Sequence, residues 1–159
     1  MEICFESIGI IQTPFNDIEG MPIQPTGAQG IKGTIEIFDA FVAGLQDLDG
    51  FSHIILLYYL HKVQSSALVV KPFLDTAERG IFSTRAPKRP NPIGFSIVKL
   101  IEIRGNTLHI ENVDILNHTP LIDIKPYLPE FDQHPADRLG WYEAVQGKVK
   151  SHRSDNRFH

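Results

Sequence analysis

The segment 80–94, GIFSTRAPKRPNPIG, combines three cations and three prolines with one asparagine, between two apolar stretches. Each proline fixes its φ angle and removes a backbone donor, so the segment has little conformational freedom to lose on folding. Arg85 and Arg89 are rigid forks of donors that suit carboxylate and phosphate groups. Residues 80–94, hereafter the proline loop, are therefore a candidate for a preorganised anion site. The alternative is a proline-rich surface connection whose charges are only solvated.

Signatures of several other chemistries are missing from the sequence. No G-x-G-x-x-G follows a strand-like run, and the glycines of GAQGIKG (27–33) are spaced wrongly for a dinucleotide fingerprint or a P-loop. The seven histidines are scattered without an H-E-x-x-H pair, which leaves a catalytic metal with little support. His53 and His61, eight residues apart in one strand-like run, are expected to share a face, either as core or surface residues or as part of a site.

Composition is that of one globular domain with a real core, since 42% of the 159 residues are hydrophobic and 21% are charged. Cys4 is the only cysteine, which excludes an intramolecular disulfide and suits a reduced cytoplasm. The N-terminus has no basic leader, and the apolar run FSHIILLYYL is too short to cross a bilayer. We therefore expect a cytoplasmic protein without a membrane span.

The net charge of −4 argues against a protein that binds nucleic acid by bulk attraction alone. Positive charge is concentrated in the proline loop and in the tail GKVKSHRSDNRFH, which carries Lys148, Lys150, Arg153 and Arg157. This tail is interpreted either as an electrostatic arm for RNA or as a solvated terminus.

The elements that must hold these residues are mostly strands. Seven runs rich in Ile, Val, Leu, Phe and Tyr are bounded by turn residues: CFESIGIIQT, GTIEIF, FSHIILLYYLH, ALVVKPF, FSIVKLIEI, TLHIENVDIL and PLIDIKPY. Alternation at 34–37 and 108–111 indicates one buried and one wet face, and RGN at 104–106 predicts a hairpin turn. Only 39–48 and 136–147 have helix-like spacing. The sequence predicts a mainly β protein, an antiparallel barrel or sandwich with one or two short helices.

The run F-S-T-R-A-P-K-R-P-N-P-I-G in the proline loop resembles the signature of the TsaA-like (TrmO) family of tRNA N6-methyltransferases. Three further stretches are similar to blocks of that family, in its order: IGIIQTPF at 8–15, GLQDLDGFSH at 44–53 with the Leu-His pair at 60–61, and TPLIDIKPY at 119–127. Together these stretches cover about residues 6–132. The resemblance implies an antiparallel β-barrel domain, predicted here at 1–135, followed by a C-terminal extension with a basic tail at 136–159.

The same resemblance implies that the barrel binds S-adenosylmethionine near the interface of a homodimer, outside the Rossmann-type methyltransferases. An aromatic face suits the sulfonium cation and an arginine fork suits the carboxylate of this cofactor. The cofactor-binding residues implied are Pro14, Phe15, Asn16, His61, Lys62, Arg85, Phe95, Asn117, His118, Thr119 and Pro120. Members commonly carry Asp-Gly before Thr-Pro, whereas this chain has an amide and an imidazole there, at Asn117 and His118. Exposed-looking aromatics, Trp141 and Tyr142, give modest support to the homodimer.

The reaction implied by the resemblance is N6-methylation of threonylcarbamoyl-adenosine at position 37, in the anticodon loop of tRNA. This nitrogen must be placed in line with the methyl group and must lose a proton. The candidate proton acceptors are Asp114, Asp123, Tyr127 and His118, which the sequence does not rank. Alternatively, Asp123 has no catalytic role and is only one of the alternating residues Asp123, Ile124 and Lys125 at the edge of a strand.

Substrate contacts are expected from cations on phosphate and from an amide on a splayed base edge or on the cofactor. The predicted substrate-binding residues are Lys88, Arg89, Asn91 and Lys125. Two other functions stay open: a methyltransferase that uses the same cofactor on a different substrate, and a non-catalytic barrel that binds RNA or S-adenosylmethionine.

Overall fold

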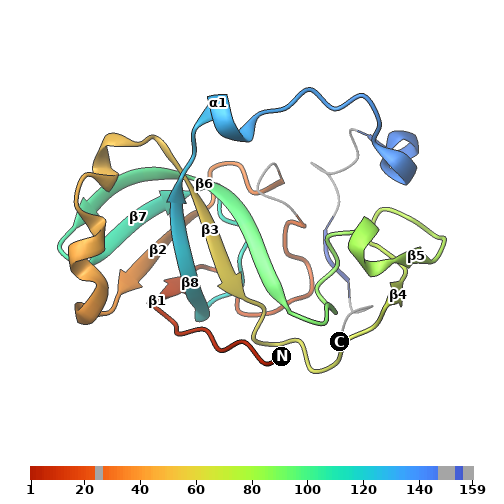
Figure 1. Ribbon diagram of the computed structural model, residues 1–159, viewed down its shortest axis with the longest axis horizontal. Helices are drawn as coiled ribbons and strands as arrows, with labels where there is room; N and C mark the ends of the chain where they lie inside the picture. Colours follow the sequence, from red (N-terminus) through yellow and green to blue (C-terminus); the bar gives the residue numbers. More distant parts are fainter. Residues whose placement is uncertain (24–26, 147–152, 156–159) are drawn as a thin grey trace.

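Six antiparallel strands close into a barrel in the computed structural model of the chain, which describes residues 1–23, 27–146 and 153–155 (Figure 1). In order around the barrel the strands are β1 (Gly9–Gln12), β2 (Lys32–Ile37), β7 (Thr107–Glu111), β6 (Ile93–Arg104), β3 (His53–Tyr59) and β8 (Thr119–Pro126). The predicted mainly β fold and its antiparallel barrel are therefore confirmed.

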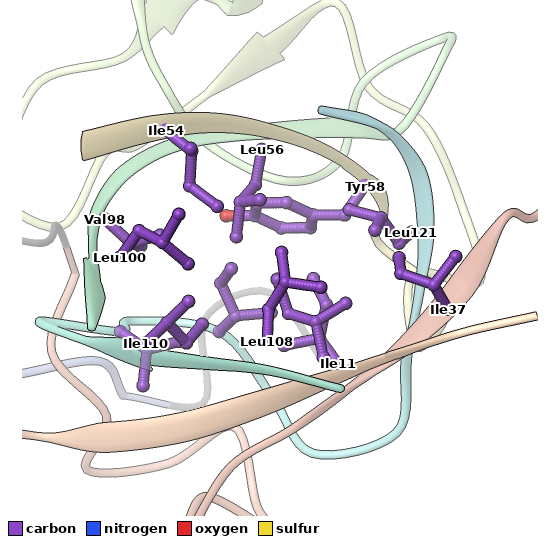
Figure 2. Close-up of a cluster of buried hydrophobic side chains, with 13 residues drawn as sticks. Ile11, Ile37, Ile54, Leu56, Tyr58, Val98, Leu100, Leu108, Ile110 and Leu121 are labelled. Carbon is purple, nitrogen blue, oxygen red and sulfur yellow. The ribbon is translucent and has the colours of Figure 1, made fainter. Parts of the chain in front are cut away.

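The interior of the barrel is filled by every second residue of its strands, because successive side chains of a strand leave on opposite sides. In β2, Ile35 and Ile37 are buried while Glu36 between them is exposed. Figure 2 shows the ring of Tyr58 lying among the aliphatic side chains of this core. Each fully buried side chain of this size contributes about 1.5–3 kcal/mol through the hydrophobic effect, so the core holds the strands in register.

The predicted hairpin at 104–106 joins β6 to β7, with Gly105 at φ 62° in the turn. The two helix-like segments form short 3-10 helices at Asp39–Leu45 and Gly140–Val145. Further short helical turns lie at Leu48–Gly50 and Ile81–Ser83 (3-10) and at Pro129–Asp132 (α1). The prediction of short helices is thus confirmed in position, although the 3-10 form was not foreseen.

Four strand predictions were too long. The run CFESIGIIQT contributes only β1 (Gly9–Gln12). The run ALVVKPF contributes only β4 (Val69–Val70), which pairs with β5 (Arg79–Gly80) in a small sheet beside the barrel (Figure 1). The run TLHIENVDIL leaves the barrel after Glu111, because Asn112 takes a left-handed φ of 66°. The prediction that the two histidines at 53 and 61 share one strand is wrong, because β3 ends at Tyr59 and His61 follows in a turn.

The C-terminal residues pack onto the barrel domain at two places. The indole Nε1 of Trp141 donates a hydrogen bond to the carbonyl of Ser83 at 2.8 Å. Ser154 pairs with the segment before residue 23: its amide donates to Met21 O at 2.9 Å, and Gly20 N donates to Ser154 O at 2.8 Å. Of the predicted basic tail, Arg153 lies in a bridge to Pro22, while the positions 148, 150 and 157 lie outside the described residues. The domain boundary at 135 stays a prediction.

None of the helices in the described ranges has the length and apolar character that a bilayer crossing requires. Among the same residues, no three His, Cys, Asp or Glu side chains lie close enough together to hold a metal ion.

Candidate functional site

A cavity of about 410 Å³ opens at the end of the barrel where β3 finishes and β6 begins. Its walls come from segments that are far apart in the sequence: 18–23, the turn after β3, the proline loop, the start of β6 and the loop between β7 and β8. Five predicted cofactor residues line it, together with two further candidates; these are His61, Lys62, Arg85, Phe95 and Thr119, with Asp114 and Arg89.

Asp114 anchors a chain of hydroxyl groups at the floor of this cavity. Ser96 Oγ donates to Asp114 Oδ1 at 2.7 Å, and the Tyr58 hydroxyl lies 2.9 Å from Ser96 Oγ. Since Ser96 has one hydroxyl proton and gives it to the carboxylate, Tyr58 must be the donor in the second bond. The relay therefore runs from Tyr58 through Ser96 to Asp114.

Burial raises the pKa of Asp114 to about 6, and the Ser96 hydrogen bond and the positive charge of Arg85 oppose this effect only in part. The pKa of Tyr58 is also raised, first by burial and then by the negative charge of Asp114. Near neutral pH, Tyr58 thus keeps its proton while Asp114 is ionised and able to accept one.

A close approach of two strands makes this relay possible. Tyr58 and Gly94 are direct partners in the β3–β6 register. A Cβ atom on Gly94 would lie 2.0 Å from Cε2 of the Tyr58 ring, so only glycine leaves space for the ring there. The last glycine of the proline loop signature therefore leaves room for the tyrosine ring, whose hydroxyl reaches Ser96.

The two arginines of the proline loop make different contacts. The guanidinium carbon of Arg85 lies 5.9 Å from the centroid of the Phe95 ring, a cation–π distance. Arg89 Nη1 instead donates to the carbonyls of Ile81, Thr84 and Ala86 at 3.2, 2.9 and 3.5 Å. Arg89 thus stabilises the conformation of its own loop, a structural role that the sequence analysis missed.

His61 lies on the opposite wall, at the end of β3. Its Nδ1 is 3.4 Å from Thr119 Oγ1, and this hydroxyl donates to Leu116 O at 2.6 Å. Burial first, and then the charge of Lys62, lowers the pKa of His61. Its ring is therefore neutral at pH 7 and offers one nitrogen as donor and the other as acceptor.

Asn117 joins the two blocks at 13–16 and 116–120. Its side-chain Oδ1 accepts from Thr13 N at 3.1 Å, and its side-chain Nδ2 donates to Asn16 Oδ1 at 2.8 Å. Its backbone N–H donates to Phe15 O at 2.7 Å. The side chain of Asn117 thus offers an acceptor oxygen to Thr13. His118 takes φ 59°, a left-handed conformation that favours glycine.

Six predicted cofactor residues are not part of the cavity lining: Pro14, Phe15, Asn16, Asn117, His118 and Pro120. Lys88 and Asn91 belong to the proline loop but also lie outside the lining. The ion pair between Lys125 Nζ and Asp123 Oδ2, at 2.7 Å, holds both side chains along β8.

Tyr127 lies beyond the far end of β8 against His53, which is at the opposite end of β3 from Tyr58. Of the four candidate proton acceptors, only Asp114 lines the cavity, and the roles of Asp123, Tyr127 and His118 stay predictions.

Sequence reasoning missed several residues that line the cavity. Tyr58 and Thr84 were read only as parts of a strand and a loop, and Met21 and Ser154 were not singled out. The glycine of N-P-I-G was the one available signal, because a glycine inside a strand often marks the close approach of another group. No sequence signal points to Ser154.

Comparison with known proteins adds three likenesses. The family model described as the tRNA-methyltransferase O N-terminal domain matches residues 10–133. The chain is 49% identical over 156 residues to a probable S-adenosyl-L-methionine-binding protein of Pyrococcus abyssi, which covers 98% of this chain and 85% of that protein. It is 34% identical over 134 residues to the human tRNA (adenine(37)-N6)-methyltransferase, which covers 80% of this chain and 30% of that protein.

The fold is also that of a solved structure. The crystal structure of TrmO from Pseudomonas aeruginosa matches with a TM-score of 0.74 and 34% identity, covering 89% of this chain and 63% of that chain. This chain therefore spans less than two thirds of the TrmO chain and less than a third of the human protein. The family model matches from β1 to just past α1, and the chain belongs to the family of the tRNA-methyltransferase O N-terminal domain.

Proposed function

We propose that this protein transfers a methyl group from S-adenosylmethionine to N6 of threonylcarbamoyl-adenosine at position 37 of tRNA. The observation that carries the proposal is the convergence of Arg85, Phe95 and Asp114 on one cavity in a barrel of this family. These groups supply an anion fork, an aromatic face and a proton acceptor, the three functions that such a transfer needs.

The cavity fits S-adenosylmethionine in size and in chemistry. Its volume of about 410 Å³ lies within the range of about 300–1,000 Å³ that is usual for small-molecule sites. The Arg85 guanidinium would hold the methionine carboxylate, and the Phe95 ring would lie beside the sulfonium cation. The neutral ring of His61 and the hydroxyl of Thr119 offer hydrogen bonds to the adenosine part. When bound, the cofactor supplies an electrophilic methyl group.

Asp114 is the proton acceptor that the geometry favours. Its pKa of about 6 leaves it ionised at neutral pH yet basic enough to take a proton during transfer. When N6 is methylated, its proton would pass to the Asp114 carboxylate. The Ser96 hydroxyl holds Oδ1 of Asp114, which keeps the carboxylate oriented.

We also propose that the protein is a cytoplasmic homodimer. Lys88, Asn91 and Lys125 are proposed to contact the anticodon loop. The aromatic residues first cited for the dimer, Trp141 and Tyr142, are only half-exposed, and the indole bonds to its own chain. Large apolar side chains exposed elsewhere, such as Ile101 and Phe131, now support the dimer instead. Sedimentation at micromolar concentration with the cofactor present tests it, and a monomer would contradict it.

The reaction is tested by radiolabelled methyl transfer to two matched tRNAs, one with threonylcarbamoyl-adenosine and one with plain adenosine at position 37. We expect labelling of the modified tRNA only, because a site built for the threonylcarbamoyl group leaves polar groups unpaired with plain adenosine. Equal labelling of both, or of neither by a protein that binds the cofactor, would point to a different methyl acceptor.

The cofactor site is tested by Arg85→Lys. A lysine keeps the charge but loses the planar fork, so we expect the Kd for S-adenosylmethionine to rise by about 10- to 100-fold. Titration calorimetry measures this, with Lys88→Ala as a control on the same loop but outside the cavity. An unchanged Kd in Arg85→Lys would remove Arg85 from the cofactor site.

A further inference from the structure

A second cavity, of about 960 Å³, adjoins the first on the outer side of the proline loop. The two cavities share Ile23, Phe73, Thr84, Arg85 and Phe95, so these residues form the wall or passage between them. The far wall of the second cavity is the 3-10 helix at 140–145, which begins beyond the residues matched by the family model. A molecule in this cavity would therefore lie next to a cofactor in the first.

Aromatic rings dominate the lining of the second cavity. Phe82, Phe95, Trp141 and Tyr142 all contribute to it. Phe82 is 76% exposed and Phe95 is 45% exposed, which is unusual for such large apolar side chains. The Trp141 and Tyr142 rings meet edge to face, with centroids 6.2 Å apart. The cavity thus gathers aromatic rings of the kind on which a nucleobase stacks, and Phe82, Phe95 and Trp141 each have a guanidinium 5.9 Å from the ring centroid.

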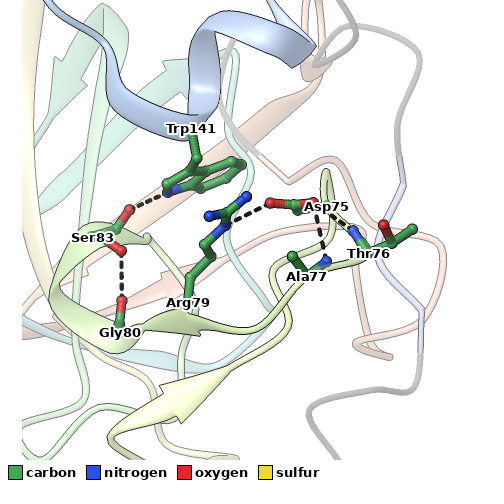
Figure 3. Close-up of polar contacts among 7 residues, drawn as sticks. All are labelled: Asp75, Thr76, Ala77, Arg79, Gly80, Ser83 and Trp141. Carbon is green, nitrogen blue, oxygen red and sulfur yellow. Dashed lines mark hydrogen bonds and ion pairs between the residues drawn. The ribbon is translucent and has the colours of Figure 1, made fainter.

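Trp141 is fixed in orientation by a polar network, as Figure 3 shows. Its Nε1 donates to Ser83 O at 2.8 Å, and the guanidinium of Arg79 lies 5.9 Å from the indole centroid. Arg79 Nε in turn donates to Asp75 Oδ2 at 2.8 Å. The other oxygen of Asp75 accepts from the amides of Thr76 and Ala77, so the arginine itself is held.

We propose that this second cavity receives the methyl-acceptor base of the RNA substrate, stacked against Trp141. The inference rests on the proposed function and assigns it a substrate pocket. An unstacked purine needs a flat apolar wall, and a wall held by hydrogen bonds and a cation is preorganised for it. The shared edge at Arg85 and Phe95 would then bring the exocyclic nitrogen toward the methyl group in the first cavity.

The first test uses fluorescence, because Trp141 is the only tryptophan of the chain. The probe is the free nucleoside N6-threonylcarbamoyl-adenosine, added to the full chain with S-adenosylhomocysteine already saturating the cofactor cavity. We expect saturable quenching of the tryptophan emission by the nucleoside and little change on adding S-adenosylhomocysteine alone. An emission that the nucleoside leaves unchanged, or that both compounds quench equally, would overturn the proposal.

The second test is the kinetics of Trp141→Ala. Stacking of one base on an aromatic side chain corresponds to a loss of roughly 5- to 150-fold when the ring is removed, so KM for modified tRNA should rise by that factor. The Kd for S-adenosylmethionine should stay unchanged, and Trp141→Phe should restore most of the KM. Phe5→Ala is the matched control, since this ring is 64% exposed and lines neither cavity.

The substrate pocket and the proposed function are disproved by different results. If Trp141→Ala keeps the parental KM while the parent still labels modified tRNA, the pocket is wrong and the proposed function stands. If the parent labels no tRNA, the proposed function fails, and the quenching experiment still decides whether this cavity binds a nucleoside. Circular dichroism and thermal unfolding of both variants show whether a change in KM reflects misfolding, in which case Trp141→Phe decides.

Discussion

Replacing Asp114 by asparagine should make the protein more stable and nearly inactive at neutral pH. The folded state raises the pKa of this carboxyl from 3.8 to about 6, chiefly through burial. The folded protein therefore prefers the neutral acid. This preference contributes stability below pH ~4 and is lost as pH rises through about 6.

The size of the effect follows from the two pKa values. At pH 7.5 the buried charge costs up to ~3 kcal/mol of folding free energy, since one pKa unit corresponds to ~1.4 kcal/mol. Asparagine has the same shape, has no charge to desolvate and can still accept the hydrogen bond from Ser96. We expect Asp114→Asn to raise the free energy of unfolding by about 1–3 kcal/mol at pH 7.5 and by almost nothing at pH 4.

The assay is urea unfolding of the parent and of Asp114→Asn, followed by circular dichroism at pH 4, 5, 6, 7 and 7.5. Methyl transfer by the same two proteins is measured in parallel, and we expect a loss of about 10²- to 10⁴-fold in kcat for the variant. The kcat of the parent should rise with pH through an apparent pKa of about 6 and level off above pH 7, because Asp114 must be ionised to accept the proton.

Two results would refute this reasoning. A difference in stability that is the same at every pH would mean that the charge of Asp114 is not the destabilising feature. A variant that keeps its kcat would show that another group accepts the proton. Ser96→Ala serves as a comparison, since it breaks the relay while leaving the carboxyl in place, and it should lower kcat less than Asp114→Asn does.

Three further changes test how the site is built. Gly94→Ala should lower the free energy of unfolding by about 1–3 kcal/mol or more, because the new Cβ meets the Tyr58 ring at 2.0 Å; a variant with parental urea and cofactor-binding curves would contradict this contact. Arg89→Ala should cost about 1–3 kcal/mol in thermal unfolding through lost bonds to loop carbonyls, whereas Asn91→Ala, at an exposed position of the same loop, should cost much less; equal costs would show that these bonds do not stabilise the loop. His118→Gly should gain ~0.5–1 kcal/mol in urea unfolding, since relief of a φ of 59° outweighs the added entropy of glycine; a loss of stability would show that the imidazole makes a contact worth more than the strain.

The sequence alone determined the class of fold and most of the strands. Alternation such as that of Ile35, Glu36 and Ile37 fixes which face of a strand is buried, and this is a local property. The turn at 104–106 and the stiffness of the proline loop are likewise set by the glycine and prolines themselves. The four stretches that resemble the family, and their order along the chain, identify the family from the sequence alone.

Only the tertiary structure decided which candidates meet in one place. Asp114 and Asp123 look alike as residues near strands, but the left-handed turn at Asn112 directs the chain carrying Asp114 to the cavity, while Asp123 stays on β8 paired with Lys125. Arg85 and Arg89 are equally cationic in the sequence and both line the cavity, yet Arg85 lies over the Phe95 ring while Arg89 bonds to loop carbonyls. Long-range closure of the barrel sets these distances and the burial that raises the pKa of Asp114, and no local pattern in the chain encodes them.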